Sequence, residues 1–523
     1  MIRNIFTVGG WTLVSRVTGF VRDVVMAAIL GAGPVADAFL VAFRLPNHFR
    51  AIFAEGAFAS AFVPAYARRL EQDGSERARE FANEIGTGLL LIQLVLLALA
   101  WAFTPQMVKL LAPGLSEDPT RFDLAVSFTR ITFPYLAFTA MLAMISGTLN
   151  ANHRFASAAA APVFLNICMV TALVATPFFP TAGHAAAWGV LIAGFFEVLL
   201  VAGDAEKHGF GFRFRMPKLD EPTKRFLKAL GPAIIGAGGV QLALFADTMI
   251  ATFLPAGALS ALYYADRINQ LPIGVAGIAI GIVLLPEMSR RLAANDESGA
   301  AVSQGRAIEL SLLIAIPFAA GAIAIPELVM RALFMRGAFS AADAHAAAMT
   351  LAAYATGLIP FMLMRSFTAP FLARGDTATP VKAALTAVAV NILLKIVLTG
   401  SLSQVGLALA TAAGAWLNLL LLIWAARRRG FEQPAVTLNC VLILAAIGLV
   451  LGLVFYAGQR FASPYFTGRS HFGEEMLLLV LLIFGAALYA TLILMLLGKN
   501  WLQNLLRPAA PVTSGQNTPT QNV

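Results

Sequence analysis

Residues Phe6–Leu30 read FTVGGWTLVSRVTGFVRDVVMAAIL, an apolar run long enough to cross a membrane that nevertheless contains charged side chains. The next apolar run, residues 34–66, contains more. The charges of the two runs are Arg16, Arg22, Asp23, Asp37, Arg44, Arg50 and Glu55. An arginine at the centre of a spanning helix costs about 2.5–3.5 kcal/mol on insertion scales. We therefore expect these residues to line a wet, cationic cavity that suits an anionic ligand.

The composition indicates an integral membrane protein. Of the 523 residues, 59% are hydrophobic and 12% are charged, whereas soluble domains are about a quarter charged. The net charge of +9 is concentrated in loops, so nucleic acid is not an expected partner. Cys168 and Cys440 both fall in apolar runs, where we expect no disulfide. Met1–Phe6 leads directly into the first run, so we expect no cleavable signal peptide.

The pattern of apolar runs predicts an all-α membrane protein with about 14 transmembrane helices. Their approximate limits are 6–31, 34–66, 82–112, 122–150, 156–180, 184–203, 228–254, 258–288, 305–334, 345–373, 379–400, 403–426, 434–458 and 473–498. Pro46 and Asn47 predict a break in the second span. Lys and Arg gather in every second loop, whereas loops such as 31–35 and 255–259 nearly lack them. By the positive-inside rule, both termini are cytoplasmic.

Several landmarks recur at an offset of about 222–226 residues, namely Pro64 with Pro286, Pro134 with Pro360 and Asn166 with Asn391. Such an offset predicts two six-helix lobes in parallel repeat, related by an axis along the membrane normal, plus two extra C-terminal helices. The predicted organisation is an N-terminal lobe at 1–203, a cytoplasmic linker at 204–227, a C-terminal lobe at 228–428, two helices at 429–500 and a cytoplasmic tail at 501–523, disordered at its end.

Three further intramembrane charges lie in the predicted C-terminal lobe. Arg267 follows Tyr263 and Tyr264 and is expected to contact the ligand from the opposite lobe, and the adjacent Asp266 is either functional or part of a local ion pair. Asp247 is either a ligand for a coupling cation or a paired residue that faces the cavity. The chain contains no P-loop and no His/Cys cluster at metal-ligand spacing, so transport is favoured over catalysis.

These stretches resemble the signature of the bacterial lipid II flippase family MurJ, also called MviN. The resemblance rests on residues 15–23, 36–39, 43–47, 53–58, 263–267 and 375–380. It implies a MATE-like flippase fold in the bacterial cytoplasmic (inner) membrane and a role in peptidoglycan biosynthesis. The implied substrate is lipid II, an undecaprenyl-pyrophosphate-linked disaccharide-pentapeptide, which would move from the inner to the outer leaflet by alternating access.

The resemblance also implies roles for single residues. Arg16, Arg22, Arg50 and Arg267 are expected to bind the pyrophosphate, and Asp23, Asp37, Arg44, Glu55 and Asp266 to supply cavity charge or gating. The last two spans would form a groove for the lipid tail. Some family members are proposed to bind sodium between spans seven and eleven. Asp247 matches the first side of that site, and Asp376 and Asn391 match the second less clearly.

No cofactor is expected apart from a coupling cation, either sodium or a proton. The expected partners are lipid II, membrane lipids and the cell-wall synthesis machinery. A flippase for another undecaprenyl-linked oligosaccharide would share the fold and the charges. A cation-coupled multidrug exporter would carry acids, rather than arginines, in the first lobe. A membrane-embedded glycosyltransferase would need paired acids in an outward loop, and a structural or receptor role predicts no cavity.

Overall fold

The structure is a computed structural model, and it describes residues 2–50, 57–466 and 472–506. Within these ranges, side chains are described except at 2–6, 48–50, 235–244, 275–283 and 506. The described chain is all-α and contains no strand, which confirms the predicted fold class.

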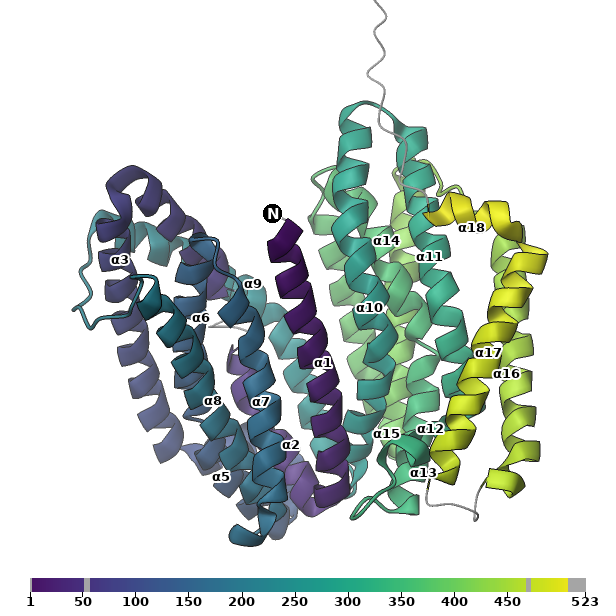
Figure 1. Ribbon diagram of the computed structural model, residues 1–523, viewed down its shortest axis with the longest axis horizontal. Helices are drawn as coiled ribbons and strands as arrows, with labels where there is room; N and C mark the ends of the chain where they lie inside the picture. Colours follow the sequence, from purple (N-terminus) through teal and green to yellow (C-terminus); the bar gives the residue numbers. More distant parts are fainter. Residues whose placement is uncertain (1, 51–56, 467–471, 507–523) are drawn as a thin grey trace, which may run out of the picture. The chain divides into compact units, whose positions relative to one another are not determined.

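The helices of the chain, shown in Figure 1, alternate with short connections. They are α1 (Ile2–Leu30), α2 (Pro34–Arg50), α3 (Ala57–Ala102), α4 (Thr104–Leu111), η2 (Pro113–Glu117), α5 (Pro119–Thr132), α6 (Tyr135–Ala151), α7 (Ala156–Val174), η3 (Thr176–Phe178), α8 (Ala182–Lys207), α9 (Glu221–Thr252), α10 (Ala258–Ala293), α11 (Glu297–Ala324), α12 (Pro326–Phe334), α13 (Ala341–Ala355), α14 (Leu358–Ala373), α15 (Ala378–Arg428), α16 (Leu438–Phe466), α17 (Gly473–Leu496) and α18 (Gly498–Leu506).

Nine helices among the described residues are long and apolar enough to cross a membrane, counting an interrupted pair such as α5–α6 as one. The two longest contain a residue that departs from helical geometry: Gly74 in α3, with φ of 84°, and Ser403 in α15, with φ of 50°. Each of these two helices therefore covers parts of two predicted spans. The count of 14 spans remains a prediction.

The predicted break at Pro46 and Asn47 is absent, because α2 continues through both residues to Arg50. Proline has no N–H, so Pro46 leaves the carbonyl of Ala42 without its usual helical donor. The hydroxyl of Thr132 in α5 donates to that carbonyl at 3.0 Å. A neighbouring helix thus supplies the missing hydrogen bond, which is how a membrane helix tolerates an internal proline.

Interruptions of the helices recur along the chain. Phe103, between α3 and α4, corresponds to Ile325 between α11 and α12 at an offset of about 222 residues. The break before α6 at Pro134 corresponds in the same way to the break before α14 at Gly357. The sequence repeat was inferred from pairs of single residues, and the helix interruptions recur at a similar offset. This is expected for a duplicated helix bundle.

The chain divides into two compact units. The first contains residues 1–260 and 334–343, and the second contains 261–333 and 344–523. In the first unit α7 packs on α1 and α8, and α3 packs on α6 and α9. In the second unit α11 packs on α14 and α16, and α16 packs on α17. Helix α9, which the sequence analysis assigned to the C-terminal lobe, clusters with the first unit.

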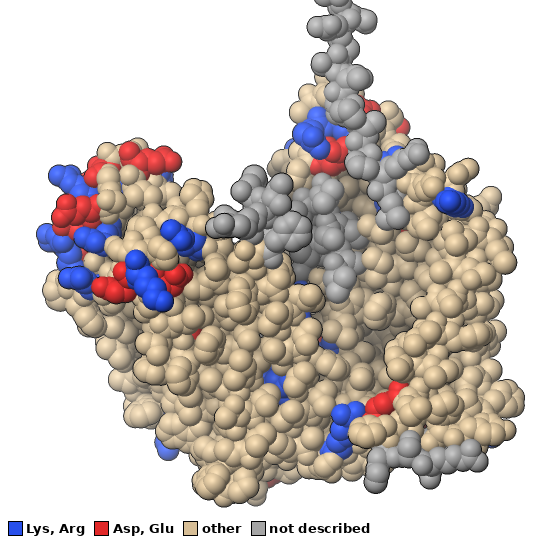
Figure 2. Space-filling model, viewed as in Figure 1, with Lys and Arg blue, Asp and Glu red and all other residues tan. Residues whose placement is uncertain are grey.

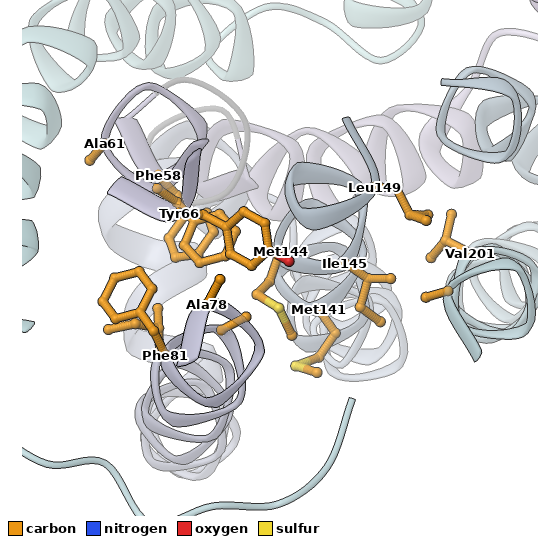
Figure 3. Packing of buried hydrophobic residues seen from close by; sticks show 14 of the residues in the cluster. Phe58, Ala61, Tyr66, Ala78, Phe81, Met141, Met144, Ile145, Leu149 and Val201 are labelled. Atoms are coloured by element: carbon orange, nitrogen blue, oxygen red, sulfur yellow. The ribbon is translucent and has the colours of Figure 1, made fainter. Parts of the chain in front are cut away.

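An aromatic cluster fixes α3 against its neighbours in the first unit. The rings of Phe58 and Phe62 stack at 5.1 Å, and Phe226 of α9 meets Phe58 edge-on at 5.8 Å. Figure 3 shows Phe58, Tyr66 and Phe81 of α3 beside Met141 and Met144 of α6, among other members of this cluster. Edge-to-face and offset ring pairs of this kind stabilise a core by about 0.5–1.5 kcal/mol beyond their burial.

Candidate functional site

Arg22 and Asp23 of α1 form a buried ion pair that α7 completes. Nη2 of Arg22 lies 2.7 Å from Oδ1 of Asp23, and both side chains are less than 10% exposed. Nη1 of Arg22 donates to Oδ1 of Asn166 at 3.1 Å. Asn166 in turn donates to the carbonyl of Ser15 and the hydroxyl of Thr18, both at 3.0 Å. The sequence analysis named Asn166 only as a landmark of the repeat and missed this contact.

The other predicted arginines differ in their surroundings. Arg16 is exposed on α1, and Arg44 is half-buried on α2. The side chain of Arg50 and the whole of Glu55 lie outside the described residues. Arg267 of the second unit is half-buried, with Nη2 donating to the hydroxyl of Tyr263 at 3.0 Å and its guanidinium 4.7 Å from that ring's centroid. The neighbouring Asp266 accepts a hydrogen bond from Gln270, one turn further along α10.

Asp37 of α2 is fully buried and binds the turn that begins α10. Its carboxylate accepts the backbone N–H of Gly257 at 2.7 Å, the N–H of Ser260 at 3.0 Å and the hydroxyl of Ser260 at 2.7 Å. Nη1 of Arg121 lies 3.7 Å from the same carboxylate and donates to the carbonyl of Leu254 at 3.3 Å. A carboxylate at a helix N-terminus also satisfies orphan N–H groups there. Asp37 and Arg121 thus join α2 and α5 to residues 254–260.

Asp247 lies on α9, which is helical through this position, so the carbonyls beside it belong to a regular helix. Its side chain is half-buried, and the next residue, Thr248, is buried. Among the residues that the structure describes, no group of three or more His, Cys, Asp or Glu side chains is arranged to hold a metal ion.

Lys395 is an intramembrane charge that the sequence analysis missed. It lies in α15, one turn after Asn391, and is only 1% exposed. A lysine in the middle of the apolar run 379–400 was the available signal, because long charged side chains are rarely buried completely unless they have partners.

An apolar pocket of about 440 Å³ lies within the second unit. It is bounded by α11, α16 and α17, with Pro317 and Gly321 on α11, Phe455 on α16 and Gly485 on α17. Tyr489 of α17 also lines it, and its hydroxyl donates to the carbonyl of Leu313 at 2.7 Å. The pocket adjoins the two C-terminal helices for which a lipid-tail groove was expected.

Comparison with known proteins agrees with these features. The family described as "Lipid II flippase MurJ" matches residues 26–474. A relative from Rhizobium meliloti (strain 1021), a probable lipid II flippase MurJ, is 41% identical over 473 residues, which cover 89% of this chain and 88% of the relative.

Two solved structures share the fold. A lipid II flippase MurJ in an inward closed conformation aligns with a TM-score of 0.77 at 23% identity, over 96% of this chain and 99% of that one. An inward-facing multidrug resistance MATE family transporter aligns with a TM-score of 0.63 at 15% identity, over 79% and 94%. With a family match across most of its length and a relative at 41% identity, the chain belongs to the lipid II flippase MurJ family.

Proposed function

We propose that this protein is a lipid II flippase, which moves the lipid-linked peptidoglycan precursor from the inner to the outer leaflet of the bacterial cytoplasmic membrane. The family match over residues 26–474 carries this conclusion. The family is one of transporters rather than enzymes. Both termini are proposed to be cytoplasmic, and the cell-wall synthesis machinery is the proposed protein partner.

We further propose that Arg16, Arg22, Arg50 and Arg267 bind the pyrophosphate. A pyrophosphate concentrates several negative charges, and the planar fork of a guanidinium matches its oxygens with paired hydrogen bonds. The burial of Arg22 and the hydrogen bonds that hold it support this role, because a fixed guanidinium loses little further freedom when it binds an anion. Asp23 then positions Arg22, and Arg44, Glu55 and Asp266 contribute charge to the cavity.

Asp37 is the proposed gate residue. By the positive-inside rule, residues 31–35 and 255–259 lie on the outer side. Asp37 accepts one hydrogen bond from Gly257 in the second of these loops and two from Ser260 just after it. Release of these bonds would open the outer side during alternating access. The apolar pocket of the second unit is the proposed site of the polyprenyl tail, because its walls offer dispersion contacts and few polar groups.

Asp247 is the proposed residue through which a coupling cation, sodium or a proton, would act. Because α9 is unbroken around Asp247, the nearby backbone carbonyls are used in helical hydrogen bonds. A sodium ion at Asp247 would therefore need further ligands from other helices. A cation-coupled multidrug exporter is less well supported, because the first lobe carries arginines where such a protein needs acids.

Complementation of cells depleted of their native lipid II flippase tests the arginine assignment. Arg22→Gln alone leaves Asp23 as a buried unpaired charge, which lowers stability whatever the role of Arg22. The double variant Arg22→Gln/Asp23→Asn removes both charges and keeps their shapes. We expect the double variant to insert in the membrane at normal levels and still fail to support growth. Growth at the wild-type rate would show that Arg22 only balances Asp23.

Arg16→Gln is the matched test at an exposed position, where loss of the charge does not disturb packing. We expect it to abolish complementation too. Lys382→Gln, which removes an exposed charge near the start of α15, is the control and should grow normally.

A further inference from the structure

The connection between α8 and α9 is an extended strap, residues 210–220, that lies along α3. The N–H groups of Arg213 and Arg215 donate to Oδ1 of Asn83 at 2.9 Å and to Oγ1 of Thr87 at 3.1 Å. The two strap donors are two residues apart, which is roughly 6.6 Å in an extended chain, and the two acceptors on α3 are four residues apart, which is roughly 6 Å in a helix. Because these spacings are similar, every second strap residue can contact the next turn of α3. The strap therefore has a fixed register on α3.

Alternate residues from Phe210 to Met216 form an apolar row that begins inside the protein and ends outside it. Phe210 and Phe212 pack against the aromatic cluster of α3, and a Cβ on Gly86 would lie 2.8 Å from the Phe212 ring. The next members, Phe214 and Met216, are 75% and 74% exposed, and Leu219 is 74% exposed. Three large apolar side chains on one short segment form a patch of the kind that marks an interaction surface.

Basic side chains accompany the exposed part of this row. The side chain of Arg213 is 80% exposed, with Glu206 at 3.9 Å, and Lys218 is exposed. Asp220 at the end of the strap is already bound by Arg69 and by the N–H of Thr223. Figure 2 shows Lys, Arg, Asp and Glu side chains gathered at the upper left, over the end of α3 that Figure 1 labels, with other residues covering most of the surface below. The strap thus presents apolar and cationic groups together.

A polar pocket of about 370 Å³ adjoins the strap. Arg79, Arg213, Arg215 and Phe214 line it together with Asn83 and two acids, Glu76 and Glu80. A carboxylate oxygen of Glu80 lies 2.6 Å from Nη1 of Arg215, so these two residues form an ion pair and neutralise each other. Arg79 and Arg213 remain in the lining with Glu76, and Glu206 lies 3.9 Å from Arg213. The pocket therefore offers two guanidinium groups and has room for a phosphate-bearing headgroup.

We propose that the strap is a binding site for anionic phospholipids of the cytoplasmic leaflet. Phe214, Met216 and Leu219 enter the interface, and Arg213 and Lys218 bind lipid phosphates. Aromatic and aliphatic side chains flanked by Lys and Arg are the composition of segments that lie in a membrane interface. The strap joins two membrane helices, so it is held beside the leaflet, where each basic residue favours anionic lipid by a factor of roughly five. The proposal is independent of lipid II transport.

Fluorescence quenching in lipid nanodiscs tests the proposal on the full-length protein. Met216→Cys, in a background with Cys168→Ser and Cys440→Ser, carries an environment-sensitive fluorophore, and the discs contain lipids with brominated acyl chains. We expect strong quenching in discs that contain phosphatidylglycerol and weak quenching in discs of phosphatidylcholine alone. Arg213→Gln/Lys218→Gln should lose most of the phosphatidylglycerol-dependent quenching. Each removed basic residue contributes a preference for anionic lipid of roughly fivefold, and the variant loses two of them.

The control variant Lys382→Gln/Arg427→Gln removes two exposed cytoplasmic charges elsewhere and should keep the full effect. A fluorophore at Glu71→Cys, on the charged end of α3, reports a water-exposed position. Two results would overturn the proposal. A label at position 216 as weakly quenched as that at position 71 in both lipids would mean that the strap faces water or a soluble protein. Equal quenching in both lipids would mean that the strap contacts the membrane without preferring anionic headgroups.

Discussion

Asp37 is the residue whose environment is most completely defined, since three hydrogen bonds and an arginine surround one buried carboxylate. Each donor that loses this acceptor while buried costs about 1–3 kcal/mol. The residue therefore holds residues 257–260 against α2. If Asp37 is the gate, as proposed, transport must offset this energy when the outer side opens. A gate needs contacts of this kind, strong in one state and absent in the other.

Replacement of Asp37 should release the turn at residues 257–260. Leu259 is 1% exposed, so a cysteine there should react slowly with a membrane-impermeant thiol reagent. We predict that Asp37→Ala accelerates the reaction at Leu259→Cys at least tenfold, which corresponds to about 1.4 kcal/mol. Asp37→Asn keeps one acceptor oxygen and should accelerate it less. Unchanged reactivity in Asp37→Ala would contradict the gating role.

At the scale of single residues, the sequence shows where intramembrane charges lie but seldom which residues contact them. Asp23 was expected to hold an arginine, and it does so because it adjoins Arg22 in the chain. The partners of Asp37 are about 220 residues away in sequence, and nothing in the local pattern around Asp37 points to them. Lys395 was missed because a single lysine hardly changes the hydropathy of a long apolar run.

At the scale of elements, the helix ends depend on a few residues with special backbone or capping roles. Gly31 ends α1 with φ of 67°, and a Cβ there would lie 2.6 Å from the carbonyl oxygen of Ala338. The N–H of Ala338 donates to the carbonyl of Ala28 at 2.7 Å, which ties the segment 334–343 to the end of α1. This contact requires a close approach of two backbones, which glycine permits.

Gly31→Ala should therefore destabilise the protein. The left-handed conformation costs a residue with a Cβ about 1–2 kcal/mol, and the contact with Ala338 adds to it. Gly33→Ala is the matched control, since a Cβ at Gly33 meets nothing within 4 Å. Thermal unfolding of the purified protein in detergent should show a lower midpoint for Gly31→Ala only. Equal midpoints would refute the close approach.

Asp296, the N-cap of α11, predicts a dependence of stability on pH. The N–H of Gly299 donates to its carboxylate at 2.7 Å, and this bond, with help from Arg291, lowers the pKa of Asp296 below 3.8. A carboxylate whose pKa is lower in the folded than in the unfolded protein stabilises the fold at pH values above its unfolded-state pKa. This stabilisation is lost as the pH falls through the pKa of the folded protein. The difference in unfolding midpoint between wild type and Asp296→Ala should be full at neutral pH and shrink below pH ~4. A constant difference would contradict this.

The elements themselves were largely predictable, because membrane helices must satisfy their backbone groups internally and therefore appear as long apolar runs. The interruption at Pro134 was not predicted, because the sequence analysis drew one span over 122–150 and used Pro134 only as a repeat landmark. The continuity of α2 through Pro46 was not predicted either, because it depends on a hydrogen bond from Thr132, about 90 residues away. The departures at Gly74 and Ser403 lie at predicted boundaries between spans, the first between residues 66 and 82 and the second at the predicted start of a span.

At the scale of the whole molecule, the repeat and the family match describe the same transporter. Helix interruptions recur at the offset that the sequence landmarks showed, and the family extends across both halves of the chain. Alternating access is proposed for this chain because transporters built from repeated halves commonly work in this way. The arginines of α1 suit the proposed phosphate ligand, whereas a cation exporter would need acids there.

The accessibility of lipid II at the outer leaflet tests the central claim most directly. Cells depleted of their native flippase, and expressing either this protein or its Arg22→Gln/Asp23→Asn variant, are treated with a membrane-impermeant reagent or enzyme that modifies exposed lipid II. Cells with the wild-type protein should expose lipid II at a normal rate, whereas cells with the variant should retain it in the inner leaflet. Lipid II that stays inaccessible in cells producing the wild-type protein would contradict the assignment.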